Sequence, residues 1–216
     1  MFKSIVSTLR TREWSRQPTP QPDWFSPVRA LNKSIIFPYR YAQLTNRLTP
    51  FLHDVTNVLD VGASDGQLAH QLTDSTGCHI TGIDVCLQPY SYIEVRRYNG
   101  RNFPFDDNAF DCVLMVDMLH HTTDIEQVLA EARRVARRFI LIKDHYWDSQ
   151  FDVRALSMAD FVGNAPYGIP LPYNYLRLTE WEHLFHDHNL GEVSRATFRY
   201  NSLDLLKHII VKLEVS

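Results

Sequence analysis

The segment VLDVGASDGQL has the composition of a ligand-binding turn. An apolar run ends at Asp60, and the small residues Gly62, Ser64 and Gly66 follow just where a helix is expected to begin. Small residues let the backbone pass close to a ligand, and free amides at a helix start favour an anionic or polar group. A tight strand-to-helix turn without a ligand has the same composition, so this turn alone is weak evidence.

A second acidic residue, Asp84, ends the next apolar run, ITGIDV. It follows the turn by about 20 residues, the spacing at which an acid reaches the hydroxyls of a ribose. A carboxylate can accept both hydroxyl hydrogens at once. A surface acid at a strand end would need no fixed spacing, so the turn and Asp84 together predict a nucleoside-containing ligand.

The stretch IKDHYWD places Asp144 and His145 after another apolar run. Histidine titrates near neutrality, and a neighbouring carboxylate can fix its tautomer, so this pair could act as a general base. A polar strand end packed beneath a loop explains the same residues equally well. Both interpretations stay open on the sequence.

The segment GNAPYGIPLPYNYL, residues 163–176, contains three prolines and three tyrosines and is too broken for a helix or a central strand. We expect it to form an irregular lid, over about residues 146–178, above a small substrate. Tyrosine combines apolar area with one polar tip, although core packing would use it too. The predicted substrate-facing residues of the lid are Asn164, Tyr173 and Asn174, and Tyr175 is a catalytic candidate.

Two adjacent histidines, His120 and His121, follow the fourth apolar run. Adjacent histidines can ligate a metal, but no Cys, Asp or Glu stands nearby at ligand spacing. The sequence therefore favours a role in lining the site, with His121 facing the substrate. We expect no metal.

The elements that must position these residues alternate between short strands and helices. Apolar runs alternating with helical patterns imply a mostly parallel sheet covered on both faces, and ligands bind beyond the carboxyl ends of its strands. Residues 1–35 are a proline-rich N-terminal arm, extended or loosely packed over residues 1–30, and residues 36–216 form one compact domain. The expected strands are 58–61, 79–85, 92–98, 112–116, 138–142, 192–200 and 207–215, and the expected helices are 39–52, 66–72, 125–135 and 179–188.

Composition excludes several classes of protein. The net charge of -3 over 216 residues gives no basic field for a nucleic acid. The three cysteines, Cys78, Cys86 and Cys112, have neither disulfide nor zinc spacing. No apolar stretch approaches membrane-spanning length, and the first residues lack the pattern of a secretory signal. We expect a cytoplasmic protein that has a small-molecule substrate and no membrane partner, and a homodimer is left open.

Together, Asp60-x-Gly62-x-Ser64-x-Gly66, Asp84 and the segment NGRNFPFDDNAFDCVLMVDMLHH resemble the class I S-adenosylmethionine (SAM) dependent methyltransferases, in the broad type 11 group. The resemblance covers about half the chain. It implies a Rossmann-like, doubly wound α/β fold whose seven-stranded sheet is mostly parallel and has a C-terminal antiparallel strand.

The same resemblance assigns SAM-binding roles to individual residues. Asp60 and Gly62 would lie against the methionine part of SAM, Asp84 would hold the ribose, and Asn99 with Gly100 would meet the adenine. Asp117 would end the fourth strand beside the methyl group. Two positions depart from the family pattern, since Ser64 stands where glycine is usual and Asn99 where aspartate is usual.

Three functional hypotheses follow. The first is a methyltransferase acting on a small-molecule acceptor, of the kind found in specialised-metabolite biosynthesis. The second keeps SAM but changes the reaction, as in azetidine-2-carboxylate synthases, which resemble methyltransferases and release methylthioadenosine. The third is a SAM-binding module without catalytic activity. A dehydrogenase is disfavoured because the pyrophosphate turn G-x-G-x-x-G is missing.

Overall fold

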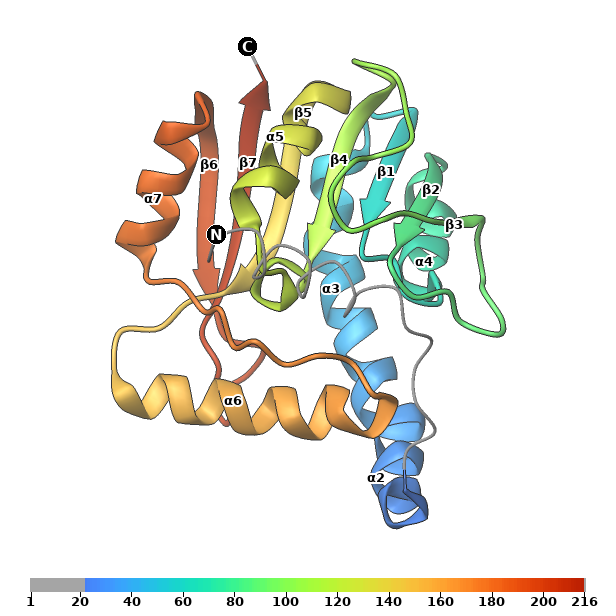
Figure 1. Ribbon diagram of the computed structural model, residues 1–216, viewed down its shortest axis with the longest axis vertical. Helices are drawn as coiled ribbons and strands as arrows, with labels where there is room; N and C mark the ends of the chain where they lie inside the picture. Colours follow the sequence, from blue (N-terminus) through green and yellow to red (C-terminus); the bar gives the residue numbers. More distant parts are fainter. Residues whose placement is uncertain (1–21, 216) are drawn as a thin grey trace, which may run out of the picture.

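A seven-stranded sheet runs through the computed structural model, which describes residues 22–215 (Figure 1). The strands stand in the order β3-β2-β1-β4-β5-β7-β6. Neighbours from β3 to β5 pair in parallel, and β7 is antiparallel to both β5 and β6. This confirms the expected fold class. The strands are β1 (Asn57–Val61), β2 (His79–Asp84), β3 (Val95–Arg97), β4 (Phe110–Val116), β5 (Ala136–His145), β6 (Leu190–Phe198) and β7 (His208–Val215).

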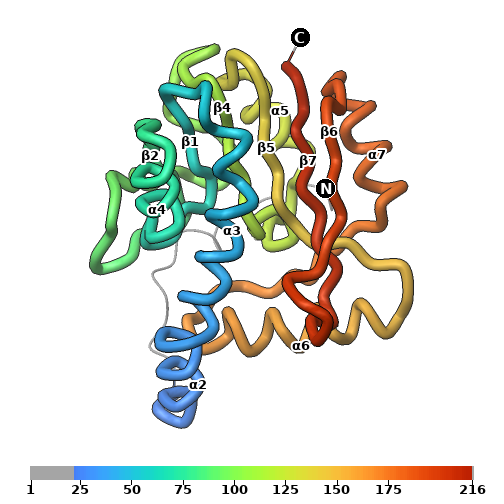
Figure 2. The backbone as a smooth tube through the Cα atoms, turned by 180° about the vertical axis from the view of Figure 1, so that it is seen from behind, coloured from blue at the N-terminus to red at the C-terminus, as the bar shows by residue number. Residues whose placement is uncertain are grey.

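Two helical layers cover the sheet. Helices α5 (Ile125–Val135) and α7 (Leu178–Asp187) lie on one face, and α3 (Phe37–Leu52) and α4 (Gln67–Thr76) lie on the other (Figures 1 and 2). Alternate residues of each central strand point to the two layers, as the two-residue period of a strand requires. In β4, for example, Val113 packs with α5 and α7. These helices and the strands lie where the sequence predicted them, apart from shifts of a few residues at their ends.

Helix α6 (Gln150–Asn164) corrects the prediction of an irregular lid over residues 146–178. A capping box starts it, in which the Ser149 hydroxyl accepts from the Asp152 amide and the Asp152 carboxylate accepts from the Ser149 amide. Only the following segment, from residue 168 to residue 175, is irregular as predicted, after a 3-10 turn at Ala165–Tyr167. Figure 1 shows α6 crossing below the carboxyl ends of the parallel strands.

The described part of the N-terminal arm is also more regular than expected. Asp23–Phe25 forms a 3-10 turn, α2 spans Ser26–Leu31, and a π-helical segment, Asn32–Ile36, joins α2 to α3. Pro27 is compatible with this because it lies in the first turn of α2, where no amide donor is needed. The prediction of an extended arm was therefore wrong for these residues, and its part at 1–21 lies outside the described residues. Within residues 22–215, no helix has the length and hydropathy to cross a bilayer.

Candidate active site

A cavity of about 1340 Å³ opens at the carboxyl edge of the parallel strands. The turns after β1, β2 and β4 line one part of it, and α6 with the segment that follows lines another. Single small-molecule pockets measure roughly 300–1,000 Å³. The cavity is therefore large enough for two ligands side by side.

The turn after β1 has a left-handed backbone at each of its three small residues. Gly62, Ser64 and Gly66 have φ angles of 79°, 53° and 72°. A Cβ atom on Gly62 would lie 2.9 Å from the Cβ of Met118, so glycine is needed there for space as well. Ser64 keeps the left-handed conformation where the family usually has glycine, and its amide donates to the Asp84 carboxylate at 2.8 Å.

Asp84 and Asp60 present carboxylates to this part of the cavity. Two backbone amides, those of Ser64 and Cys86, hold Asp84 in place, and burial raises its pKa. Asp60 is 5% exposed and has no hydrogen-bond partner within residues 22–215. Burial and the nearby Asp84 raise the pKa of Asp60 to about 7. A buried carboxylate without a donor fits a ligand that carries a cationic group.

Asn99 and Gly100, to which the resemblance assigned the adenine, line the cavity beyond β3. The Asn99 side-chain oxygen accepts from the amides of Arg101 and Asn102, at 2.9 and 2.8 Å. Its role within the protein is therefore to shape the turn that faces the cavity, where the positive φ of Gly100, 77°, is part of the same bend.

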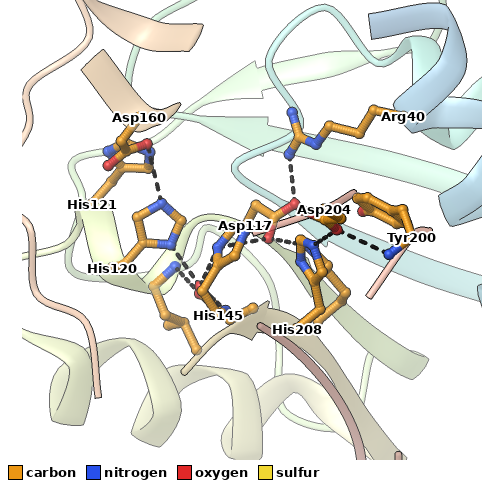
Figure 3. Close-up of polar contacts among 12 residues, drawn as sticks. Arg40, Asp117, His120, His121, His145, Asp160, Tyr200, Asp204 and His208 are labelled. Atoms are coloured by element: carbon orange, nitrogen blue, oxygen red, sulfur yellow. Dashed lines mark hydrogen bonds and ion pairs between the residues drawn. The ribbon is translucent and has the colours of Figure 1, made fainter. Parts of the chain in front are cut away.

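A buried cluster of charged side chains surrounds Asp117, the residue that directly follows β4 (Figure 3). The Asp117 carboxylate accepts from Lys143 of β5 and, at 2.6 Å, from Arg40 of α3. Lys143 is fully buried. Burial alone would raise the pKa of Asp117, but Lys143 and Arg40 outweigh it and hold the pKa well below its usual range. Asp117 lies at the end of β4 as expected, and it is already saturated by two cations of the chain.

The catalytic candidates Asp144 and His145 end β5 beside His120. Asp144 is buried, accepts from His120 Nδ1 at 2.6 Å, and accepts from the amides of Leu119 and His145. Burial is outweighed by His120, so the pKa of Asp144 falls well below its usual range. Burial and Lys143 lower the pKa of His145, whose ring lines the cavity.

The segment after α6 brings some of its predicted residues to the cavity and leaves others away from it. Asn164 and Tyr175 line the cavity together with His121. Tyr173 is 39% exposed and Asn174 donates to the Thr122 carbonyl, and neither lines it. Tyr175 donates to the Asp160 carboxylate at 2.8 Å. That acid faces His120 and His121 from α6.

Sequence reasoning missed several polar residues of the site. Lys143 left a usable signal, since a lysine inside the apolar run FILIKDH needs a buried acid. Asp160 left none, because the histidines that it faces lie about 40 positions away in the chain, whereas His208 pairs with Asp204 only four residues earlier. The missed residues are Arg40, Lys143, Asp160 and His208, all of which line the cavity except the fully covered Lys143.

Part of the chain is similar in sequence to known methyltransferases. Residues 59–139 match the family described as "Methyltransferase domain". The glycine/sarcosine/dimethylglycine N-methyltransferase of Actinopolyspora halophila is 30% identical over 95 residues, which are 38% of this chain and 17% of that protein. A demethylmenaquinone methyltransferase of Tropheryma whipplei, strain Twist, is 34% identical over 90 residues, 37% of each chain. The matched part therefore spans less than half of these relatives.

Solved structures share the fold at low sequence identity. A putative methyltransferase in complex with the Haloferax volcanii Trm112 methyltransferase activator has a TM-score of 0.64 at 13% identity, covering 89% of this chain and 94% of that one. Geranyl diphosphate methyltransferase, solved with its diphosphate substrate and sinefungin, has a TM-score of 0.63 at 12% identity, covering 81% and 78%. The chain therefore has the fold of the class I SAM-dependent methyltransferase superfamily, and its residues 59–139 match the methyltransferase-domain family.

SAM is the cofactor of this superfamily, and the residues present fit it. The partnerless Asp60 carboxylate suits the ammonium group of its methionine part, and Asp84 suits its ribose hydroxyls. The turn at Gly62 leaves the backbone accessible to the cavity. By the resemblance, Asn99 and Gly100 would meet the adenine.

We expect Lys143→Met to destabilise the protein by about 3–5 kcal/mol, because it removes the buried cation beside the Asp117 carboxylate. The double variant Lys143→Met/Asp117→Asn should recover a large part of this loss, since it also removes the negative charge of the buried Asp117 carboxylate. Urea unfolding followed by tryptophan fluorescence measures both variants together with Asp117→Asn alone. Strictly additive effects would contradict a coupled ion pair.

We expect the affinity for S-adenosylhomocysteine, which carries the same ammonium group, to fall as the pH falls through 7. A carboxyl group with a pKa of about 7 is roughly nine-tenths ionised at pH 8 and one-tenth at pH 6, so the affinity should drop roughly tenfold. Calorimetric titrations at the two pH values measure the drop. Asp60→Asn should bind more weakly at pH 8 and lose most of the pH dependence, and an equal pH dependence in both proteins would argue against Asp60.

Proposed function

We propose that the protein transfers the methyl group of SAM to a small-molecule acceptor. The observation that carries the proposal is the single cavity that joins a SAM-binding half to a second half built by α6 and the segment after it. Its volume of about 1340 Å³ exceeds what one ligand of ordinary size fills. The part of the cavity that bound SAM would leave free has the size of a small molecule and not of a groove for a macromolecule.

The two halves have different chemistry. In the first, Asp60, Gly62, Asp84, Asn99 and Gly100 hold SAM. Bound there, SAM supplies an electrophilic methyl group: the acceptor's lone pair bonds to the methyl carbon while the carbon–sulfur bond breaks, and its electron pair stays on sulfur, leaving S-adenosylhomocysteine. The protein's own contribution is to align the acceptor and to exclude water.

The second half offers both apolar and polar contacts to the acceptor. Leu156, Ala159 and Ile169 give it an apolar surface. His121, Asn164 and Tyr175 add hydrogen-bonding groups at one side. This mixture suits an acceptor with an apolar body and one polar head. The polar head would face the histidines.

Of the three catalytic candidates, we keep His145 as the catalytic group, and Asp144 and Tyr175 as residues that position their neighbours, Tyr175 through its hydrogen bond to Asp160. His145 lines the cavity, and its buried Nδ1 atom faces the carboxylates of Asp117 and Asp144 at 3.4 and 3.6 Å. We assign to the other ring nitrogen of His145 the role of receiving a proton from an oxygen or nitrogen nucleophile. Asp144 acts as a positioning residue, since it holds His120 and the amide of His145.

The relatives support the class of substrate only in general terms. The curated relatives carry the names of enzymes acting on glycine derivatives, demethylmenaquinone and sterols, all of them small molecules. They differ so much in polarity that the acceptor of this chain is not fixed by them. A role in specialised-metabolite biosynthesis is part of our proposal.

The test is to incubate purified protein with SAM, first alone and then with a panel of small-molecule acceptors, and to identify the nucleoside product by mass spectrometry. We expect S-adenosylhomocysteine in the presence of a suitable acceptor and unchanged SAM in its absence. Asp84→Ala should lose both SAM binding and product, because its carboxylate is the group that faces the ribose.

Other outcomes separate the alternatives. Methylthioadenosine formed from SAM alone, and lost in Asp84→Ala, would indicate intramolecular SAM chemistry of the azetidine-2-carboxylate synthase kind. Measurable SAM binding without any product across the panel would indicate a catalytically silent module. No detectable SAM binding would contradict all three hypotheses.

A further inference from the structure

His120, His121 and Asp160 form a cluster at the side of the cavity, which we call the His-His-Asp cluster (Figure 3). The two histidines lie on the 3-10 turn Leu119–His121 after β4, and Asp160 lies on α6. The Asp160 Oδ1 atom is 3.5 Å from His120 Nε2 and 3.4 Å from His121 Nε2. Three atoms able to donate electron pairs to a cation therefore face one another.

Each member of the cluster is fixed by a partner on its far side. His120 Nδ1 is 2.6 Å from the Asp144 carboxylate, and His121 Nδ1 is 3.0 Å from the Pro170 carbonyl. Both partners accept, so a hydrogen on each Nδ1 leaves the Nε2 lone pair directed at the cluster. The Tyr175 hydroxyl donates to Asp160 Oδ2 and leaves Oδ1 facing the histidines. Metal-binding histidines and carboxylates are characteristically oriented in this way by outer hydrogen bonds.

We propose that the His-His-Asp cluster binds one divalent transition-metal ion in the side of the cavity. Bonds of 2.0–2.1 Å arranged tetrahedrally around an ion separate neighbouring ligand atoms by about 3.4 Å. The Asp160 Oδ1 atom lies at 3.4 and 3.5 Å from the two Nε2 atoms. Two of the three separations therefore match those of ligands that share an ion, and all three ligand atoms lie within 4.8 Å of one another.

A neighbouring group of residues does not have that spacing. His120, Asp144 and His145 also bring ligand atoms together, but His120 Nδ1 and Asp144 Oδ1 are 2.6 Å apart. That separation belongs to a direct hydrogen bond and is too short for two ligands of one ion. Asp144 is therefore an outer partner of His120 and not a ligand.

The charges of the surrounding groups support a doubly charged cation. Asp144 and Asp160 together carry two negative charges in a buried region, and without an ion a protonated His120 offsets one of them, a proton that a bound ion would displace. A divalent ion would balance the two carboxylates. The Asn164 amide nitrogen donates to Asp160 Oδ1 at 2.7 Å and lies 3.4 Å from His121 Nε2, so a bound ion would displace this donor from the two acceptor atoms.

The ligand types select the class of metal. Two imidazoles and one carboxylate suit zinc, iron, cobalt or nickel, whereas magnesium and calcium prefer oxygen ligands. Three protein ligands leave at least one coordination position open, as catalytic sites require. All three ligands line the cavity, so that position faces the half assigned to the acceptor. A bound ion would polarise an oxygen or nitrogen there.

The metal site is independent of methyl transfer, so its test does not need an acceptor. Untagged protein freed of metal by chelation is titrated with Co²⁺, and visible absorption and metal analysis are recorded after gel filtration. We expect one Co²⁺ per chain with ligand-field bands that Zn²⁺ displaces and Mg²⁺ does not. His121→Gln and Asp160→Asn should each abolish the bands at the same free Co²⁺ concentration.

Two further variants make the result specific. Tyr175→Phe keeps every ligand and removes an outer hydrogen bond, so the affinity should fall by roughly 10–100-fold without loss of stoichiometry. His186→Gln changes an exposed histidine of α7 and should bind Co²⁺ like the unmodified protein. Circular dichroism melting confirms that each variant is folded.

The proposal is overturned if the folded protein binds no Co²⁺ at stoichiometric amounts. It is equally overturned if binding persists in both His121→Gln and Asp160→Asn, or if His186→Gln removes it. Because SAM binding is measured separately, loss of the proposed methyl transfer with intact Co²⁺ binding would leave the metal site standing. Methyl transfer without Co²⁺ binding would contradict the metal site and leave the proposed transferase activity standing.

Discussion

The site depends on how buried carboxylates are balanced by positive charge. Asp60, Asp117 and Asp144 lie at or next to the carboxyl ends of adjacent strands β1, β4 and β5, in a region from which water is largely excluded. A buried carboxylate is costly unless it is paired and hydrogen-bonded. Each of the three carboxylates is balanced in a different way, and each way corresponds to a different role in the site.

Asp117 is balanced by the protein itself, through Lys143 and Arg40, and so contributes structure to the cavity. Asp144 is balanced by His120, whose pKa is raised to about 10 because Asp144 and Asp160 outweigh the effect of burial. Asp60 has no such partner, and its pKa is raised. Of these three carboxylates, the one without a counter-charge is thus the one that faces the proposed cationic cofactor.

Helix α6 determines what the second half of the cavity can do. It crosses the carboxyl edge of the sheet and carries Asp160 to the histidines that follow β4. Without that crossing, the cavity would hold a SAM-binding half open to water. Its position is fixed at the N-terminal end by the Ser149–Asp152 capping box and by the Lys207 ion pair with Asp152, at 2.9 Å. A local hydrogen-bond pattern therefore sets the geometry of the acceptor half.

The sequence by itself determined the sheet, its flanking helices and the residues of the half in which we propose that SAM binds. These features depend on residues close together in the chain: strand and helix periodicity, the turn from Asp60 to Gly66, and an acid at the end of the next strand. It failed for α6, because the tyrosine and proline content of the following segment obscured the Ser149–Asp152 capping box, which the sequence contains.

Only the tertiary structure decided which polar groups meet. The contacts of Arg40 with Asp117 and of Asp160 with His121 join residues that are 77 and 39 positions apart, and no spacing rule connects such pairs. Hydrophobic patterning specifies which face of an element is buried, but the angle and height at which a helix crosses the sheet depend on packing of the whole chain. That packing places a carboxylate against two histidines, and it turns a pair of adjacent histidines into a candidate metal site.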